Sequence, residues 1–328
     1  MKRISRRGSL IVLAVLLLLI GLIWHERWNI YDYFRLYNYH PSAQVVQLAD
    51  QTTMTSYGRH LFYVYHPSLE GKTDFNTNCP NYSQQSSVLG CTVYERGIYL
   101  YNVQDPQLNG VVQVTAAYEM LHVGYQRLST SQRQHIDQLV QQAYESAAAS
   151  DPELKSEEQN YLKTEGQSAV ANELHSMMGT EVANLPPQLE SYYKTYFSNR
   201  QAIVSLKNQY QQAFTSRQAT AQQLYSQITS IEQQLSNLRG QINTLEADLK
   251  DKRQSIDAQR SNVSDVSAFN AEVDSYNNEI TQYQSQINTY NQLVAQHNQI
   301  VGQYQQIALQ ENQLIKDIDS HSSTVSPQ

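Results

Sequence analysis

The chain has 328 residues, of which 40% are hydrophobic and only 16% are charged, and its mean hydropathy is −0.56. This length allows two domains of ordinary size, and Gln, Asn, Ser and 24 Tyr residues supply much of the polarity. The formal net charge is −7, and four cations lie within the first seven residues, so the remainder carries −11. A chain that is acidic outside one short tip lacks the basic stripe that nucleic-acid binding needs. The composition therefore excludes nucleic acid as a partner.

The N-terminal segment combines a basic tip with an apolar run. Leu10–Trp24 contain no charged side chain, and this length lies between a signal-peptide core and a full span of roughly 20 residues. No small-residue cleavage site follows, and Trp24 and Trp28 suit a membrane interface. We therefore predict an uncleaved transmembrane signal anchor over residues 9–28 that binds the lipid bilayer. The positive-inside rule places the basic tip, residues 1–8, in the cytoplasm and the bulk of the chain outside. A cleaved signal and a buried core helix are the alternatives.

Two cysteines, Cys79 and Cys91, are the only ones in the chain. In an oxidising compartment such a pair is typical of a disulfide, and half of a zinc knuckle would need a closer spacing. We predict a Cys79–Cys91 disulfide with Cα atoms within about 7 Å of each other.

Residues 29–186 show mixed patterning and contain most of the Gly and Pro residues. The β-rich runs are Arg59–Tyr65, Val88–Tyr94 and Ile98–Val103, and the last two flank a hairpin signal. Helical patterns follow over Val111–Arg127, from Ser129 or Ser131 to about Ala149, from Asp151 onward, and over Val170–Met178 up to Gly179. The order predicts an α+β domain in which a short antiparallel sheet precedes a set of helices.

The character of the sequence changes at Pro186-Pro187. Hydrophobic residues then fall at alternating spacings of four and three in two runs, Leu224–Ile256 and Phe269–Tyr304. Two matched runs around a break predict a long antiparallel α-helical coiled-coil hairpin over 187–318, with its turn near 257–268 and a disordered tail over 319–328. A turn centred at residues 262–263 makes the position numbers of facing residues sum to 525, which pairs Ile228 with His297. A prion-like Gln/Asn-rich segment is the competing interpretation, but such tracts need no seven-residue register.

One segment of the predicted domain could carry chemistry. In zinc peptidases, two His residues four apart on one helical face hold the metal, and the Glu after the first His activates the bound water. Glu119 and His122 stand at the positions of that Glu and of the second His, and Tyr118 stands at the position of the first His. On spacing alone, a surface Glu and a packed His explain this pattern better.

The surroundings of the motif add information, because several further pieces occur in a fixed order. They are Thr52–Arg59, Leu61–Val64, Arg96–Tyr101, Val114–His122, Asn172–Glu181, Leu185–Glu190 and Tyr196–Arg200. With these pieces, the stretch from about Leu48 to Arg200 resembles an uncharacterised family of single-pass bacterial envelope proteins with zincin-like motifs. The resemblance implies a zincin-like metallopeptidase domain with a full H-E-x-L-H motif, and this chain departs from it at Tyr118.

The resemblance also implies zinc as the cofactor, with Glu119 as the catalytic residue and His122 as a metal ligand. A Tyr118 ligand would first have to lose a proton, because a phenol has a pKa near 10. Glu173 and His175 are the candidates for the third ligand, and two residues this close on a helix point about 200° apart, so only one can face the site. Similarity to Glu-ligand zincins favours Glu173, whereas His175 is the better intrinsic ligand. Glu181 is a further candidate.

These features predict a membrane-anchored extracytoplasmic protein with a degenerate zinc motif and little or no peptidase activity. Its coiled-coil arm would contact an envelope protein or peptide partner. The alternatives are an active zinc metallopeptidase with an unusual ligand set and a purely structural coiled-coil envelope protein. The sequence has no P-loop and no dinucleotide fingerprint, so we expect no nucleotide.

Overall fold

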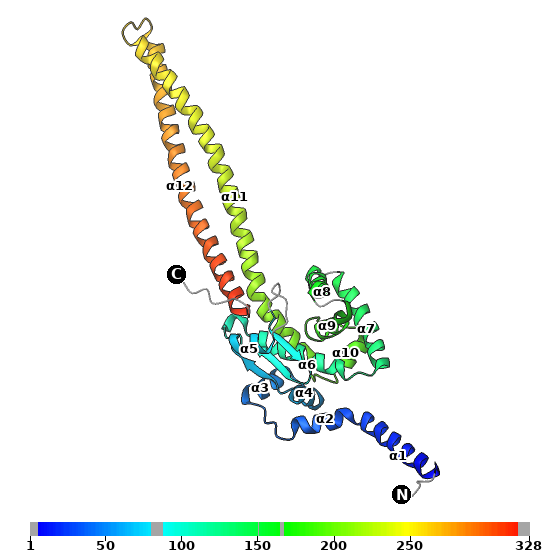
Figure 1. Ribbon diagram of the computed structural model, residues 1–328. Helices are drawn as coiled ribbons and strands as arrows, with labels where there is room; N and C mark the ends of the chain where they lie inside the picture. The colour runs from blue at the N-terminus through cyan, green and yellow to red at the C-terminus, as the bar shows by residue number, and fades with distance from the viewer. Residues whose placement is uncertain (1–5, 80–87, 150, 165–166, 321–328) are drawn as a thin grey trace. The chain divides into compact units, whose positions relative to one another are not determined.

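The computed structural model describes residues 6–79, 88–149, 151–164 and 167–320, and its course is shown in Figure 1. The elements are α1 (Arg6–His25), α2 (Arg27–Leu36), α3 (Ala43–Gln51), α4 (Ser56–Val64), β1 (Ser68–Glu70), α5 (Lys72–Asn78), β2 (Gly90–Val93), β3 (Gly97–Tyr101), the 3-10 turn η1 (Pro106–Leu108), α6 (Val111–Gln126), α7 (Thr130–Ala148), α8 (Pro152–Thr164), α9 (Gln167–Thr180), α10 (Pro187–Tyr193), α11 (Arg200–Gln259) and α12 (Val266–Ile318). The prediction of a small sheet with helices, followed by a long helix pair, is confirmed at this level.

The sheet has three strands in the order β1-β3-β2. Strands β2 and β3 form the predicted antiparallel hairpin, and Glu95 adopts a left-handed conformation in its turn. Strand β1 instead pairs with β3 in parallel, Ser68 opposite Tyr99. The sheet is therefore mixed, and the prediction of an antiparallel sheet is wrong for one of its two pairings. A parallel pair needs a crossover connection, and α5 lies in the segment between the two strands.

The predicted strand Arg59–Tyr65 is a helix, α4, in the structure. Thr55 caps it, because its side-chain oxygen accepts a hydrogen bond from the backbone N–H of Gly58 at 3.0 Å. The β-branched and aromatic residues that indicated a strand are buried against α6. Tertiary packing and a good cap override local β-propensity here.

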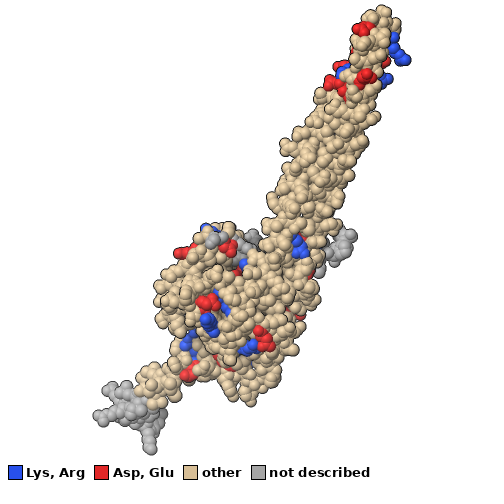
Figure 2. Space-filling view, turned by 180° about the vertical axis from the view of Figure 1, so that it is seen from behind, with Lys and Arg blue, Asp and Glu red and all other residues tan. Residues whose placement is uncertain are grey.

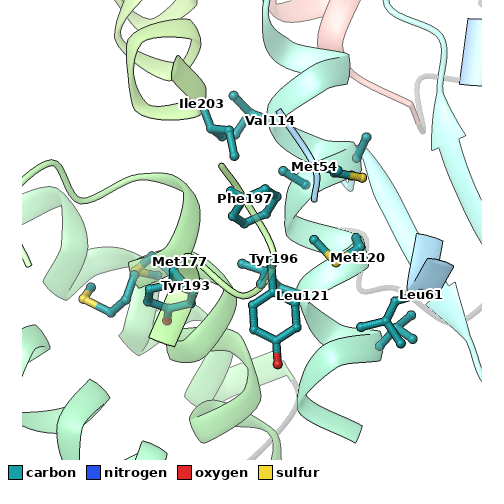
Figure 3. Packing of buried hydrophobic residues seen from close by; sticks show 14 of the residues in the cluster. Met54, Leu61, Val114, Met120, Leu121, Met177, Tyr193, Tyr196, Phe197 and Ile203 are labelled. Atoms are coloured by element: carbon teal, nitrogen blue, oxygen red, sulfur yellow. The ribbon is translucent and has the colours of Figure 1, made fainter. Parts of the chain in front are cut away.

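The core of this part of the chain surrounds α6, which packs against α3, α4, α9, β2 and β3. Its buried residues include Met54, Leu61, Met120, Leu121, Met177, Tyr193, Phe197 and Ile203, which Figure 3 shows together. The segment around Phe197 also pairs with residue 54 in an isolated antiparallel bridge. This bridge joins the start of the domain to the residues that lead into α11.

Helices α6 and α9 approach each other closely at Gly179. A Cβ atom added to Gly179 would lie 2.3 Å from Leu121 Cδ1 and 2.8 Å from Tyr193 Cε1. The sequence predicts that the helix ends at Gly179, whereas α9 continues through it to Thr180. The glycine therefore serves close packing between helices and does not end the helix.

The disulfide prediction is confirmed. Cys79 and Cys91 are bonded, and their Cα atoms lie 6.2 Å apart. Together with Phe75 they form a small buried cluster beside β3, separate from the main core. The bond ties the end of α5 to strand β2.

The chain divides into two compact units, the second of which is Ala213–Leu314 and the first of which contains the residues before and after it. The predicted boundary at 186/187 therefore differs from the structural one. Helix α10 contributes Leu189 and Tyr193 to the core, and the first turns of α11 contribute Ile203. The two prolines at 186 and 187 stand at the start of α10, a short helix of the first unit, and not at the start of the hairpin.

Within the second unit, α11 and α12 run as a long pair joined by residues 260–265, inside the predicted turn. The rings of Tyr225 and Tyr304 lie 6.5 Å apart between centroids. Nε2 of His297 lies 3.4 Å from Glu232 Oε1, one helical turn beyond the predicted partner Ile228. The contacts between the helices are thus displaced by about one turn from the register that a symmetric turn predicts.

The C-terminal end of the chain departs in part from prediction. Residues 1–5 of the predicted tip and residues 321–328 of the predicted tail lie outside the described residues. Ser320 is buried and donates a hydrogen bond to the carbonyl oxygen of Val88, so an ordered end reaches past 319.

The predicted anchor is not one straight helix, because α1 ends at His25 and α2 follows at an angle. Among the described residues, no single helix meets the length and hydropathy expected of a membrane span. The pair Leu13–His25 and Arg27–Leu36, bent by 57°, meets them together.

Candidate functional site

Helices α6 and α9 carry the residues that the motif singles out. Tyr118, Glu119 and His122 lie on α6, and Glu173 and His175 lie on α9. The prediction that Tyr118 and His122 share a face directed at α9 is confirmed, because both approach Glu173. Residues four apart on a helix lie on one face, and a tight contact between α6 and α9 brings that face to its partner.

Tyr118 and Glu173 form the shortest contact of the site. The Tyr118 hydroxyl donates a hydrogen bond to Glu173 Oε2 at 2.7 Å, and it lies 3.1 Å from the hydroxyl of Tyr161 on α8. Burial, followed by the nearby Glu173, raises the pKa of Tyr118 well above its usual value of 10.0. The phenol is therefore protonated at neutral pH and acts as a donor.

His122 completes the cluster from the same side. Its Nε2 atom lies 3.7 Å from Glu173 Oε2, and its Nδ1 atom lies 3.4 Å from the Ser176 hydroxyl. The imidazole ring stands edge-on to the Tyr118 ring, with centroids 5.1 Å apart. The Oε2 atom of Glu173 thus accepts the hydrogen bond from Tyr118 and also faces the imidazole ring of His122. We call Tyr118, His122 and Glu173 the α6–α9 triad.

Glu119 lies next to the triad on α6 but contacts the sheet. Its backbone carbonyl and its Oε2 both accept from the Thr92 hydroxyl of β2, at 3.0 and 2.9 Å. A Cβ atom on Gly90 would lie 2.9 Å from Glu119 Cγ, so the strand needs a glycine to approach the helix this closely. The predicted catalytic carboxylate is buried and bound to the edge strand.

His175 points away from the triad into a cluster of tyrosines. Its Nε2 atom lies 2.8 Å from the Tyr192 hydroxyl, and the rings of Tyr125, Tyr192 and Tyr193 surround it within 5.5 Å between centroids. Complete burial, followed by the nearby His122, lowers the pKa of His175 to about 3. Between the two candidates for a third ligand, the structure brings Glu173 to the site and His175 to the core.

These side chains do not fit the zinc site that the resemblance implies. Such a site needs three deprotonated protein ligands. Here His122 and Glu173 offer two, and the third group is a phenol that burial and Glu173 keep protonated. In the described ranges, no group of three or more His, Cys, Asp or Glu side chains has an arrangement that could hold a metal ion.

Two surface hollows lie elsewhere in the first unit. One, of about 390 Å³, lies between α7 and α9 and is lined by residues that include Asp137, Gln141 and Leu174. Another, of about 470 Å³, lies near the start of α6 and is lined by residues that include Gln47, Asn102 and Gln113. The α6–α9 triad lines neither of these two.

Sequence reasoning missed several partners of the site. Thr92 and Tyr161 have no motif that marks them, and only the fold brings them to α6. Glu181, a further candidate ligand, pairs instead with Lys207 at 3.7 Å. No position pattern could have predicted these contacts, because the partners lie far apart in the chain.

A scan against protein-family models found no match for this chain, and neither did a comparison with curated proteins or one with solved structures.

Proposed function

We propose that this protein is a membrane-anchored, extracytoplasmic protein with a metallopeptidase-like domain that does not hydrolyse peptides, and that its long helix pair serves interactions in the cell envelope. One observation carries the non-hydrolytic assignment. The Tyr118 hydroxyl donates to Glu173 Oε2 at 2.7 Å, at the position where the motif would have a metal-binding imidazole.

The chemistry of that contact supports the proposal. A zinc ion would have to displace a phenol proton whose removal both burial and the carboxylate disfavour. Glu119, the candidate for activating water, accepts a hydrogen bond from Thr92. The hydroxyl of Tyr118 is bonded to Glu173, and His122 lies near Ser176, so the triad resembles a structural network more than an open catalytic site.

The membrane anchor is supported by the side chains of α1. Its apolar residues from Leu13 to Trp24 are exposed, including Leu18 at 68% and Trp24 at 69%. A run of exposed leucines costs free energy in water and gains it in hydrocarbon. We therefore assign α1 to the bilayer, with the rest of the chain outside.

The arm is supported by its unusual surface. No Asp, Glu, Lys or Arg occurs from Ile280 to Gln310, whereas eight acidic and four basic residues lie between Glu246 and Glu279. On the face that Figure 2 shows, charge on the long helix pair accordingly gathers near its tip. The shaft carries few charges, with Arg217, Glu232 and Arg239 on α11, whereas the charged tip offers a localised surface for a partner.

Zinc binding of the full chain in detergent tests the assignment. We expect the unaltered protein to bind no stoichiometric zinc at neutral pH. Tyr118→His should gain zinc, because it restores a neutral imidazole beside His122 and Glu173. Adding His122→Ala to that variant should abolish the gain, whereas adding His135→Ala, which alters an exposed histidine of α7, should leave it unchanged.

Stoichiometric zinc in the unaltered protein that disappears in His122→Ala would contradict the proposal and support an active metallopeptidase with an unusual ligand set. Failure of Tyr118→His to bind zinc would contradict the view that the triad is a zinc site altered at one ligand.

A further inference from the structure

Helix α2 carries an apolar, mostly aromatic face that nothing in the described part of the chain covers. Ile30, Tyr33, Phe34 and Tyr37 are 41, 61, 73 and 68% exposed. Spacings of three and four place these residues on one side of the helix. We call them the outer face of α2.

The opposite face of α2 is fixed to the domain, where Tyr31 and Leu36 pack against the main core beside several polar contacts. The buried Asp32 accepts from Arg127, the residue that follows α6, at 2.6 Å, and it lies 2.8 Å from His60 Nε2 on α4. Arg35 donates to the carbonyl oxygens of Val64 and Arg96, both at 2.9 Å. Arg127 also lies over the ring of Trp28, 4.0 Å from its centroid. These contacts hold α2 against the first unit.

A surface helix in water turns its apolar residues to the core and its charged residues to solvent. Helix α2 packs apolar residues on the core as well, but Asp32 and Arg35 also face the protein, and the outer face is apolar instead of charged. The arrangement suits a helix whose outer side does not meet water.

The continuity of the chain identifies what covers the outer face. Only Glu26 separates α2 from α1, whose exposed apolar side chains we assign to the bilayer. Arg27 lies between the rings of Trp24 and Trp28, 4.7 and 5.3 Å from their centroids, as a cation does that extends to the membrane surface. Tyr and Trp side chains are typical of that depth.

We propose that the outer face of α2 lies in the headgroup region of the bilayer and so fixes the orientation of the first unit on the membrane; this rests on the proposed membrane anchor. The bend of 57° turns α2 away from the direction of α1. A broken span is disfavoured, because Asp32 and Arg35 hold α2 on the domain and ten residues extend only about 15 Å.

Spin labels on the full chain, reconstituted in vesicles of phosphatidylcholine and phosphatidylglycerol, test the proposal. Phe34→Cys reports on the outer face and Leu16→Cys reports on the anchor. Tyr225→Cys is the matched control, because this aromatic residue of α11 is 57% exposed. Cys79 and Cys91 are bonded to each other and do not take the label. Tyr37→Cys repeats the measurement in case Phe34→Cys disturbs folding.

We expect oxygen to reach the label at 16 several-fold more than a water-soluble nickel reagent, and the reverse at 225. At 34 the ratio of the two accessibilities should lie between those at 16 and 225, because both reagents enter the headgroup region. Oxygen preference at 16 with the same nickel preference at 34 and 37 as at 225 would overturn this inference and leave the anchor standing. Nickel preference at both 16 and 34 would overturn the anchor as well. Exclusion of both reagents at 34, with magnetic coupling between chains, would show that a second copy covers the outer face.

Discussion

At the residue scale, Tyr118 differs from the histidine of a zinc motif in where its proton resides. A neutral imidazole has a free lone pair at pH 7, whereas a phenol of raised pKa keeps its proton and donates it in a hydrogen bond. Glu173 Oε2 accepts that bond and also faces His122. At this position the phenol therefore donates a hydrogen bond to Glu173, where an imidazole could offer a lone pair to a metal.

Removal of the Tyr118 hydroxyl tests how much this network contributes to the stability of the fold. We expect Tyr118→Phe to lower the free energy of unfolding by about 1–3 kcal/mol, because a partly buried carboxyl group loses its donor. Chemical denaturation of the purified chain measures the change. Tyr225→Phe, which removes an exposed hydroxyl, is the control and should have no measurable effect. Equal stability of the two variants would show that the Tyr118–Glu173 bond contributes nothing.

The buried His175 should make stability depend on pH. In the unfolded chain this side chain takes up a proton near pH 6.5, whereas burial keeps its folded pKa at about 3. Between these values the unfolded state binds more protons, so the contribution of His175 to stability falls as the pH is lowered, by up to about 1.4 kcal/mol per pH unit.

Unfolding free energies measured between pH 7 and pH 4 should show this slope in the unaltered chain and a shallower one in His175→Gln. His135→Gln, at an exposed position of α7, should keep the original slope. An identical slope in all three proteins would mean that His175 is not held neutral in the fold.

At the scale of elements, the contact between α6 and α9 places the triad, and glycines make the contact possible. Gly179 allows Leu121 and Tyr193 to approach α9, and Gly90 allows β2 to approach Glu119. A helix interior normally disfavours glycine, because alanine is better by about 1 kcal/mol. Close packing therefore outweighs propensity at residue 179.

Two glycine substitutions separate the effect of close packing on stability from the effect of helix propensity. We expect Gly179→Ala to lower the free energy of unfolding by about 1–3 kcal/mol, because the new methyl group would overlap Leu121 and Tyr193. Gly302→Ala in α12 meets no atom within 4 Å and should raise stability slightly. Thermal unfolding of both variants measures the difference, and a stabilised Gly179→Ala would contradict the close approach of α6 and α9.

At the scale of the whole molecule, the chain is two units with different physical character. The first has a mixed core of aliphatic and aromatic residues around α6. The second is a pair of long helices of 60 and 53 residues, part of which belongs to the first unit. The pairing of these helices depends on side chains along their length and on a turn of six residues between them.

Crosslinking can test that pairing. Tyr225→Cys combined with Tyr304→Cys should crosslink within one chain, because the two rings lie 6.5 Å apart. Tyr225→Cys combined with Ile300→Cys, the partner in the symmetric register, should crosslink more slowly. Electrophoresis under non-reducing conditions distinguishes the products. Crosslinks that form only between chains would show that the helices pair between molecules.

The sequence by itself determined the features that depend on local patterns. The hairpin of β2 and β3, the helices from Val111 onward and the long helix pair follow from period, caps and turn residues. Ser129, for example, one of the two predicted caps, is the N-cap of α7 and forms a capping box with Gln132. The disulfide also followed, because two cysteines have one possible pairing.

Only the tertiary structure decided what depends on neighbours distant in the chain. It made Arg59–Tyr65 part of a helix, because the core beside α6 buries that face, and it placed β1 parallel to β3. It chose Glu173 over His175 for the triad, because the packing of α9 turns one side chain to Tyr118 and the other to Tyr192. Sequence spacing shows that only one of the two can face α6, but which one does depends on how two helices pack.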